Sequence, residues 1–464
     1  PEELAGLKRR LPDFALAGCE FMEAYLKALW LKPAAIRTQL DLLARHASKE
    51  TQGEMFEHLQ LDPSLLEADL AWHVRAWGRW VLREARRELA RFYPTYAEFC
   101  SLDPYRRVPL AREAEEQLKL VPTNEAGEPQ IDLLNAGFDK KTYLDNDKNP
   151  RWVAKPTVAY LWARTVKCKA CRATVPLLKT RWLAKKDNKR VVLTMEPNAE
   201  RTGVVFGIDP EAKVQGGNAA QRREHDKRLG SGTMTRSGAT CPCCSAIMTM
   251  EDIQLEGRAG RLSEVLTAVV VDSPSGKEFR TPTQDELTAS QPPGDALTDA
   301  FEQIPYGAPN EPISPDRPSP NTRGASGLTR YGFDNWGAIF SSRQLLALST
   351  VLRKTRNDAW NAIRQANSLG GWHEALIAYL FASFDKLLTN STTICSWNCN
   401  TTSIRHTFGR FALPMVWDFT EINPLSALAG GYENSMDWVA EAVAFALEAG
   451  RASHDAQCLR TSAT

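Results

Sequence analysis

The sequence predicts an α+β protein in which helical segments flank a β-rich middle region. Two patterns predict this class: apolar residues recur at helical spacing toward both ends of the chain, and runs of β-branched residues gather between them. A third observation is that cysteines cluster within the β-rich part. With 464 residues, the chain has room for two to four domains and can bury a large core without disulfides.

The predicted helices are marked by apolar residues three and four positions apart. The clearest one runs from Asp69 to Phe92, and Pro94 ends it. Further helices are predicted over 341–363, 373–388 and 436–449. The first helix also carries an arginine at every fourth position, which indicates either a solvated face or a stripe for the DNA backbone: Arg75, Arg79, Arg83, Arg87 and Arg91.

Short β-branched runs and a proline-rich stretch divide the rest of the chain. Strands are predicted around 191–193, 204–206 and 268–271. Nine prolines lie between Pro282 and Pro320, which is typical of a linker or a long surface loop. We therefore expect four consecutive segments: a helical and irregular region at 1–150, a β-rich region at 151–272, a Pro-rich linker or loop at 273–330, and a helical region at 331–464.

The cysteines supply the strongest chemical signal. Four of the ten form two knuckles, each with two residues between its members: Cys168 and Cys171, then Cys241 and Cys244. In a chain without an export signal, clustered cysteines are more often metal ligands than disulfide partners. Four thiolates match the tetrahedral preference of Zn²⁺, so we predict a closed, structural zinc site in the β-rich region. Cys243 does not fit the two-residue spacing and is expected to be a bystander.

The net charge of +1 excludes a globally polycationic nucleic-acid binder, but it conceals a local excess of positive charge. Ten basic residues and a single acid, Asp187, lie between Arg164 and Arg190. Such clusters neutralise phosphates and favour DNA binding, although a solvated hairpin tip at 185–189 is an equally open interpretation. The candidate DNA contacts are Lys179, Arg181, Lys185, Lys186, Lys189, Arg190, Arg222 and Arg223.

Searches for catalytic motifs find none. The chain contains no GxGxxG or GxxxxGK[ST] phosphate loop, no GxSxG elbow and no HExxH helix, so no catalytic residue is predicted. It contains no run of about 18 apolar residues and no signal-peptide pattern, so we expect no membrane partner and a cytoplasmic location.

Several longer stretches carry a family resemblance. They are VAKPTVAYLWARTV at 153–166, directly before the first knuckle, FSSRQLLAL at 340–348, and GRFALPMVWDF at 409–419 followed by EINP at 421–424. Together with the knuckles, these stretches resemble the DUF1156 family, which is described as adenine-specific DNA methylases containing a zinc ribbon. The resemblance extends over nearly the whole chain.

The resemblance implies a portion of a DNA adenine-N6 methyltransferase that uses S-adenosylmethionine. Members of the family are larger. Their Gly-rich cofactor loop precedes the part that matches this chain, and their Asp-Pro-Pro-Tyr catalytic tetrapeptide follows it. Neither motif occurs here, so this chain is expected to correspond to the middle of such an enzyme and to be inactive alone. The zinc cysteines are the only family residues that transfer position by position.

Two other interpretations stay open. The chain could be a non-enzymatic zinc-ribbon module that binds DNA or recognises a target, either alone or with a separate chain that carries the catalytic motifs. It could also be a decayed fragment. The basic segment around the knuckles motivates the first of these.

Overall fold

The structure is a computed structural model that describes residues 70–102, 118–273, 276–315, 327–366, 371–409, 413–428 and 430–452. Residues 1–69 of the predicted helical and irregular region lie outside the described residues. The protein mixes helix and sheet, which confirms the α+β class at this level. The chain forms two compact units: unit 1 comprises 1–82, 354–384 and 435–464, and unit 2 comprises 83–353 and 385–434.

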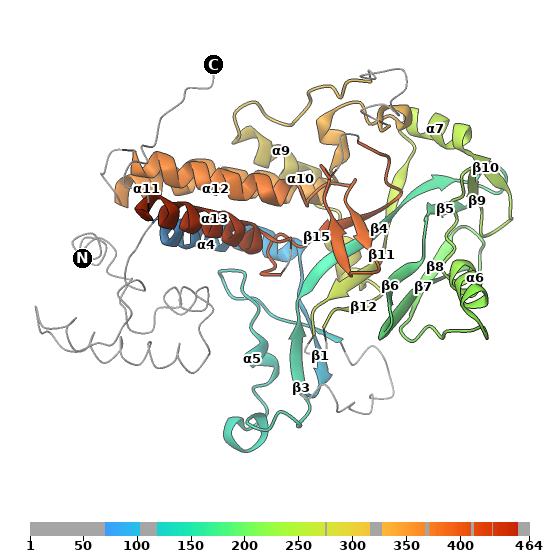
Figure 1. Cartoon of the computed structure of the whole chain (residues 1–464), viewed down its shortest axis with the longest axis horizontal. Helices are drawn as coiled ribbons and strands as arrows, with labels where there is room; N and C mark the ends of the chain where they lie inside the picture. The colour runs from blue at the N-terminus through green and yellow to red at the C-terminus, as the bar shows by residue number, and fades with distance from the viewer. Residues whose placement is uncertain are drawn as a thin grey trace, which may run out of the picture. The chain divides into compact units, whose positions relative to one another are not determined.

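The described part of unit 1 is helical (Figure 1). It contains all or part of α4 (Leu70–Leu89), η8 (Lys354–Ala359), α11 (Trp360–Ala366), α12 (Trp372–Leu388) and α13 (Tyr432–Ala452). The helix predicted over 69–92 is therefore confirmed as α4, which continues into a short 3-10 turn, η3 (Ala90–Phe92).

Helices α4 and α13 make close contact at a glycine. A Cβ on Gly78 would lie 2.1 Å from Met436 Sδ, so any larger residue at this position would require the methionine side chain to shift. On the same side of α4, Arg75 forms an ion pair with Asp437 of α13, at 3.5 Å. The arginine series therefore does not form a uniform solvated face, because its first member packs between helices.

Unit 2 is built around one long strand. The strand β4 (Thr157–Lys167) is the centre of a five-stranded antiparallel sheet of order β12-β11-β4-β15, and β5 pairs with its end. Ten of its eleven residues are buried, as expected for a strand with neighbours on both edges. The other strands of this sheet are β5 (Thr174–Leu177), β11 (Ser263–Val271), β12 (Glu278–Arg280) and β15 (Asp418–Ile422).

Smaller antiparallel sheets and helices complete unit 2. One sheet has the order β2-β1-β3, with β1 (Tyr96–Cys100), β2 (Leu118–Leu120) and β3 (Arg151–Lys155). A second joins β6 (Trp182–Lys186), β7 (Lys189–Pro197) and β8 (Val204–Asp209). Two hairpins are β9 (Gly238–Thr240) with β10 (Ile247–Thr249), and β13 (Ser396–Asn398) with β14 (Ser403–Arg405). The helices are α5 (Ile131–Leu134), α6 (Ala219–Leu229), α7 (Met250–Arg258), α8 (Gln284–Ala289), α9 (Gly294–Glu302) and α10 (Ser342–Arg353), with turns η5 (Lys140–Leu144), η6 (Thr329–Tyr331) and η7 (Trp336–Ile339).

Part of the Pro-rich segment at 273–330 contains regular structure. The helix α8 begins at a capping box in which Thr283 and Glu286 satisfy each other's backbone N–H groups. Glu286 is fully buried and pairs with Arg280 of β12, at 2.6 Å. Because a buried carboxylate needs such partners, this pair ties the first third of the segment to the sheet.

None of the described helices combines the length and the apolar character that crossing a lipid bilayer requires.

Candidate metal centre

Each predicted cysteine knuckle is the loop of a β-hairpin. The first joins β4 to β5, where Lys167 faces Thr174, and the second joins β9 to β10, where Thr240 faces Ile247. Both loops therefore contain six residues, 168–173 and 241–246. Two hairpins that are distant in sequence thus present the same kind of loop.

The two loops share their hydrogen bonds as well as their length. In the first, the Cys168 N–H donates to the Ala173 carbonyl at 2.8 Å, and the Arg172 N–H donates to the Cys168 carbonyl at 3.0 Å. In the second, Cys241 donates to Ala246 and Ser245 to Cys241, both at 2.9 Å. The fifth residue of each loop, Arg172 or Ser245, has a positive φ of 63° or 62°. The turn that directs the sulfurs is therefore the same in both knuckles.

The four knuckle sulfurs converge on one point. All four Sγ atoms lie within 4.8 Å of one another, and two distances between the knuckles, Cys168 to Cys244 and Cys171 to Cys241, are 3.7 Å. A tetrahedral ion bound at about 2.3 Å separates its sulfur ligands by about 3.8 Å. The group can therefore hold a metal ion, as the sequence predicted.

Each knuckle contributes one buried and one exposed cysteine. Cys168 and Cys241 are buried, whereas Cys171 and Cys244 are exposed. Burial raises the pKa of the Cys168 thiol, but the backbone N–H groups of Cys171 and Ala170 outweigh it and lower that pKa to about 7. Burial instead raises the pKa of the Cys241 thiol, so in the metal-free group the thiolate is favoured at Cys168 and disfavoured at Cys241.

The fifth clustered cysteine points elsewhere. The thiol of Cys243 is buried and donates to the Gly203 carbonyl at 3.3 Å. The Cys243 carbonyl in turn accepts from Arg201 Nη1 at 3.2 Å. Both contacts attach the turn between β7 and β8 to the second knuckle, so Cys243 has a packing role outside the four-sulfur group.

The first knuckle is attached to a helix. Lys169, inside the loop, forms an ion pair with Asp252 of α7 at 2.7 Å. The same carboxylate accepts from the Thr249 N–H in the capping box that begins α7. Since α7 follows β10 directly, Asp252 links one knuckle to the helix that extends from the other.

Six of the eight predicted DNA contacts make hydrogen bonds or ion pairs within the protein. Arg181 donates to the carbonyls of Ser231 and Leu229, both at 2.8 Å. Lys185 and Arg190 both pair with Asp226 of α6. These contacts join α6 to the β6–β7 hairpin (Figure 1). Lys186 donates to Thr402 and Lys189 to the Lys277 carbonyl.

Three of the eight candidates are exposed, and one of these three, Arg222, donates to the Gly216 carbonyl at 3.1 Å. Arg222 and Arg223 lie on α6, and Lys179 lies between β5 and β6. Lys227 and Arg228 are exposed on the same helix, whereas Asp226 is used in the pairs with the hairpin. Glu224 is the one exposed acid of α6. The outer surface of α6 therefore carries more positive than negative charge.

The sequence patterns did not identify a buried ion pair between Arg343 of α10 and Glu421 of β15. Arg343 Nε and Nη2 donate to the two carboxylate oxygens of Glu421, each at 2.8 Å, and both side chains are 1% exposed. One signal was available in the sequence, because Glu421 interrupts the apolar strand between Phe419 and Ile422.

Aromatic side chains enclose this ion pair. Trp162 Nε1 donates to Glu421 at 2.9 Å, and the Arg343 guanidinium lies 4.1 Å from the centre of the Tyr160 ring and 4.9 Å from that of Tyr93. Burial alone would lower the pKa of Arg343, but the charge of Glu421 raises it overall. The arrangement keeps both charges and fixes α10 to the central sheet.

Comparisons of the chain with protein-family models, with curated proteins and with solved structures gave no match.

Proposed function

We propose that this chain is a zinc-ribbon, DNA-binding portion of a DNA adenine-N6 methyltransferase. In this proposal the ribbon holds one structural Zn²⁺, and exposed cations on α6 contact the DNA backbone. The observation that carries the proposal is the pair of matched hairpins whose four sulfurs converge at tetrahedral spacing.

The choice of zinc follows from the ligands. Four thiolates and no oxygen or nitrogen ligand favour Zn²⁺ over Mg²⁺ or Ca²⁺, which prefer oxygen. A group of four cysteines also fills all positions of a tetrahedral ion, so no position is left for a substrate. The proposed role of the ion is therefore to hold two hairpins together.

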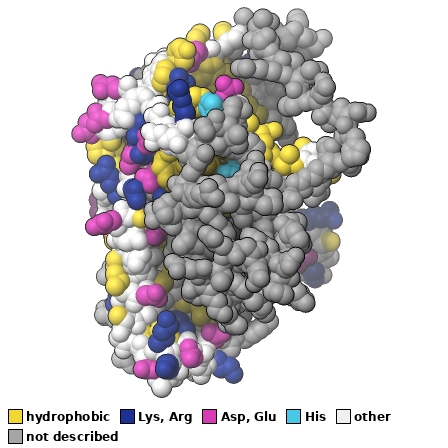
Figure 2. Space-filling view, turned by 90° about the vertical axis from the view of Figure 1, so that its left-hand side faces the viewer, with side chains coloured by type: hydrophobic (Ala, Val, Ile, Leu, Met, Phe, Trp, Pro, Cys, Tyr) yellow, Lys and Arg dark blue, Asp and Glu magenta, His cyan; other side chains and the backbone are white. Residues whose placement is uncertain are grey.

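The DNA part of the proposal depends on local charge. Over the described part of the face in Figure 2, basic and acidic side chains are interspersed, in keeping with the net charge of +1. The helix α6 differs, because Arg222, Arg223, Lys227 and Arg228 are exposed on it and Asp226 is paired with the hairpin. Exposed cations on one helix suit the phosphates of a nucleic-acid backbone.

The methyl-transfer part rests on the resemblance of 153–166, 340–348 and 409–424 to the methylase family. The chain contains neither the family's Gly-rich cofactor loop nor its Asp-Pro-Pro-Tyr tetrapeptide. We therefore expect no methyl transfer from S-adenosylmethionine to DNA by this chain alone, and activity only when a second chain supplies both motifs. If no such chain confers activity while DNA binding persists, the non-enzymatic module is the better description.

A salt titration of DNA binding tests the proposal. Binding of the zinc-loaded chain to a labelled duplex, followed by fluorescence anisotropy, should weaken steeply between 50 and 200 mM salt. The double substitution Arg222→Ala/Arg223→Ala should weaken binding to all sequences alike. It should also reduce the slope of log K against log salt by about 2, because each lost phosphate contact removes about 0.9.

The matched control is Lys140→Ala/Lys141→Ala, which removes another adjacent and exposed basic pair, at η5. This control should leave both affinity and slope unchanged. No binding at 50 mM salt, or equal losses from the two double substitutions, would contradict the proposed role of α6.

A further inference from the structure

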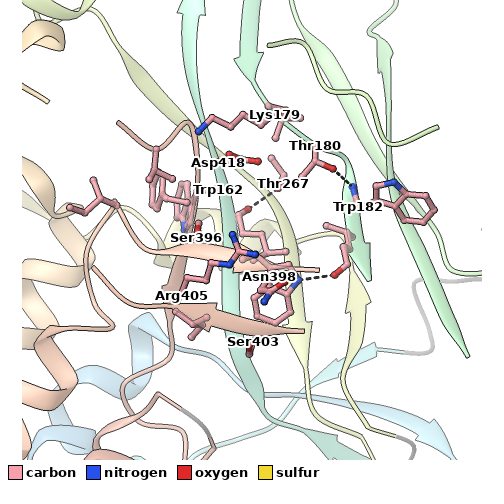
Figure 3. Close-up of a pocket in the computed structure, with 18 of the residues that line it drawn as sticks. Trp162, Lys179, Thr180, Trp182, Thr267, Ser396, Asn398, Ser403, Arg405 and Asp418 are labelled. Atoms are coloured by element: carbon pink, nitrogen blue, oxygen red, sulfur yellow. Dashed lines mark hydrogen bonds between the residues drawn. The ribbon is translucent and has the colours of Figure 1, made fainter. Parts of the chain in front are cut away.

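Unit 2 contains a cavity of about 770 Å³ (Figure 3). Its walls come from β4, β6 and β15, from the β13–β14 hairpin, and from residues 178–180 between β5 and β6. The volume lies within the range of pockets that enclose small organic ligands. None of the four knuckle cysteines lines it. The cavity is therefore a second candidate site in the same unit.

Two cationic side chains in the cavity are free to meet a ligand. Lys179 and Arg405 are exposed, and neither side chain makes a hydrogen bond or ion pair with another described residue. Figure 3 shows both extending into the space that Asp418 also faces. Most other basic side chains near β6 and β7 are paired, so these two are suited to bind an anionic group.

An acid and an amide lie in the same cavity. Asp418 is half-buried at the start of β15, and burial raises its pKa to about 6 although the charge of Lys179 opposes this. Asn398 of β13 also lines the cavity, with its amide oxygen accepting from the Asn400 N–H at 3.2 Å. Its amide nitrogen remains available as a donor. Together these groups can accept from and donate to the edge of a polar ring.

The rest of the lining combines apolar and aromatic side chains with hydroxyl-bearing side chains and one histidine. The rings of Trp162 and Phe419 are nearly parallel, with centres 5.9 Å apart, and Trp397 lies on the neighbouring hairpin. Further apolar lining residues include Leu178, Leu183, Leu193, Ile394 and Met415, and the polar ones are Thr180, Thr267, Ser396, Thr401, Ser403, His406 and Thr407. An inorganic anion alone would leave such walls facing water, whereas a flat organic ring would cover them.

We propose that this cavity binds a nucleotide, with the phosphate at Arg405 and Lys179 and the edge of the base at Asp418 and Asn398. A nucleotide combines the three properties that the walls require: a strong anion, a flat ring, and donors and acceptors on the edge of that ring. The shared chemistry fits a free mononucleotide and also a single nucleotide of a strand. This site is independent of α6, so its test can succeed or fail separately from that of the DNA-binding proposal.

The test uses the full zinc-loaded chain and the four nucleoside 5′-monophosphates as probes. Isothermal titration calorimetry should give one site per chain for at least one of them, with a Kd below 1 mM. Tryptophan fluorescence should change at the same concentration, because Trp162 and Trp397 line the cavity. Inorganic phosphate and the matching nucleoside should each bind at least tenfold more weakly than the nucleotide.

Substitutions assign the binding to this cavity. Arg405→Ala and Lys179→Ala remove exposed side chains that make no hydrogen bond or ion pair with another described residue, so neither should disturb folding, and each should weaken nucleotide binding about tenfold. Asp418→Asn should change the preference among the four bases. The control Lys140→Ala/Lys141→Ala, at η5, should leave nucleotide affinity within twofold of the parent protein.

Competition identifies the source of the nucleotide. A single-stranded oligonucleotide that displaces the mononucleotide and binds more tightly indicates a nucleotide of a strand, and a mononucleotide that binds without such competition indicates a free one. Either result supports the site. Three results would overturn it: no mononucleotide binding at 5 mM, phosphate binding as tightly as the nucleotide, or Arg405→Ala and Lys179→Ala both binding like the parent protein.

Discussion

At the scale of single residues, Arg343 is the largest side chain that is fully buried in the described structure. Its guanidinium has two bonds to Glu421 and a third to the Phe92 carbonyl at 3.0 Å, with aromatic rings on its faces. Removing two ions from water is costly, so such a pair need not stabilise the protein more than a well-packed apolar pair. Removing one partner does destabilise the protein, because the remaining charge is then buried without an opposite charge.

Breaking this pair should therefore be strongly destabilising. We predict that Arg343→Met lowers the free energy of unfolding by about 3–5 kcal/mol, as measured by urea denaturation. The matched control is Arg261→Met. Arg261 also donates two hydrogen bonds of 2.8 Å to one carboxylate, that of Glu256, but this pair lies on the surface. That control should have little effect. Equal losses from the two substitutions would show that burial does not determine the strength of the Arg343 pair.

Asp418 should make stability depend on pH. Its folded-state pKa of about 6 exceeds the value near 3.9 expected in the unfolded chain. Between these values the folded protein binds more protons, so the contribution of Asp418 to stability is lost as pH rises from about 4 to 6. Asp418→Asn removes this loss and should stabilise the protein by about 1–2 kcal/mol at pH 7.5, with no gain at pH 4.

Thermal unfolding at the two pH values measures the difference. The matched control is Asp187→Asn, at the exposed tip of the β6–β7 hairpin, and it should show no difference between pH 4 and pH 7.5. If Asp418→Asn is neutral or destabilising at pH 7.5, the carboxylate is better solvated or better paired than its surroundings indicate.

At the scale of elements, the two knuckle hairpins repeat one local design. The fifth loop residue must adopt a positive φ, which costs a residue with a side chain more than it costs glycine. Ser245→Gly should therefore raise the free energy of unfolding by about 0.5–1 kcal/mol in the metal-loaded protein. Ser231→Gly, also exposed but at a negative φ, should lower it. A loss at both positions would contradict the strain at Ser245.

Local sequence patterns predicted individual helices and strands better than they predicted which elements pack or pair with one another. The spacing of apolar residues identified α4, α10, α12 and α13, and β-branched runs marked β7, β8 and β11. The knuckle spacing identified the four cysteines that could hold a metal ion and set Cys243 apart. The pairing of β4 with β15 could not be predicted, because these strands are about 260 residues apart and no local signal joins them. For the same reason, the Arg343–Glu421 pair and the cavity around Asp418 emerged only from the folded chain.

At the scale of the whole molecule, long-range contacts carry the organisation. Both units are assembled from separate stretches of sequence. Within unit 2, the four-sulfur group brings Cys168 and Cys171 together with cysteines about 70 residues later, and the intervening stretch contains β6, β7, β8 and α6. Closing so long a loop removes much of the freedom of the unfolded chain, so a bound ion should stabilise the region between the knuckles most.

The central claim is that two hairpins form one metal centre, and a metal measurement on four proteins tests it most directly. Elemental analysis of the purified chain should find one zinc per chain. Cys171→Ser and Cys244→Ser should each lower that content sharply and lower the melting temperature, whereas Cys243→Ser should keep the full zinc content. The account would be contradicted by a parent chain without stoichiometric metal, or by a Cys243→Ser protein that loses zinc as fully as Cys171→Ser.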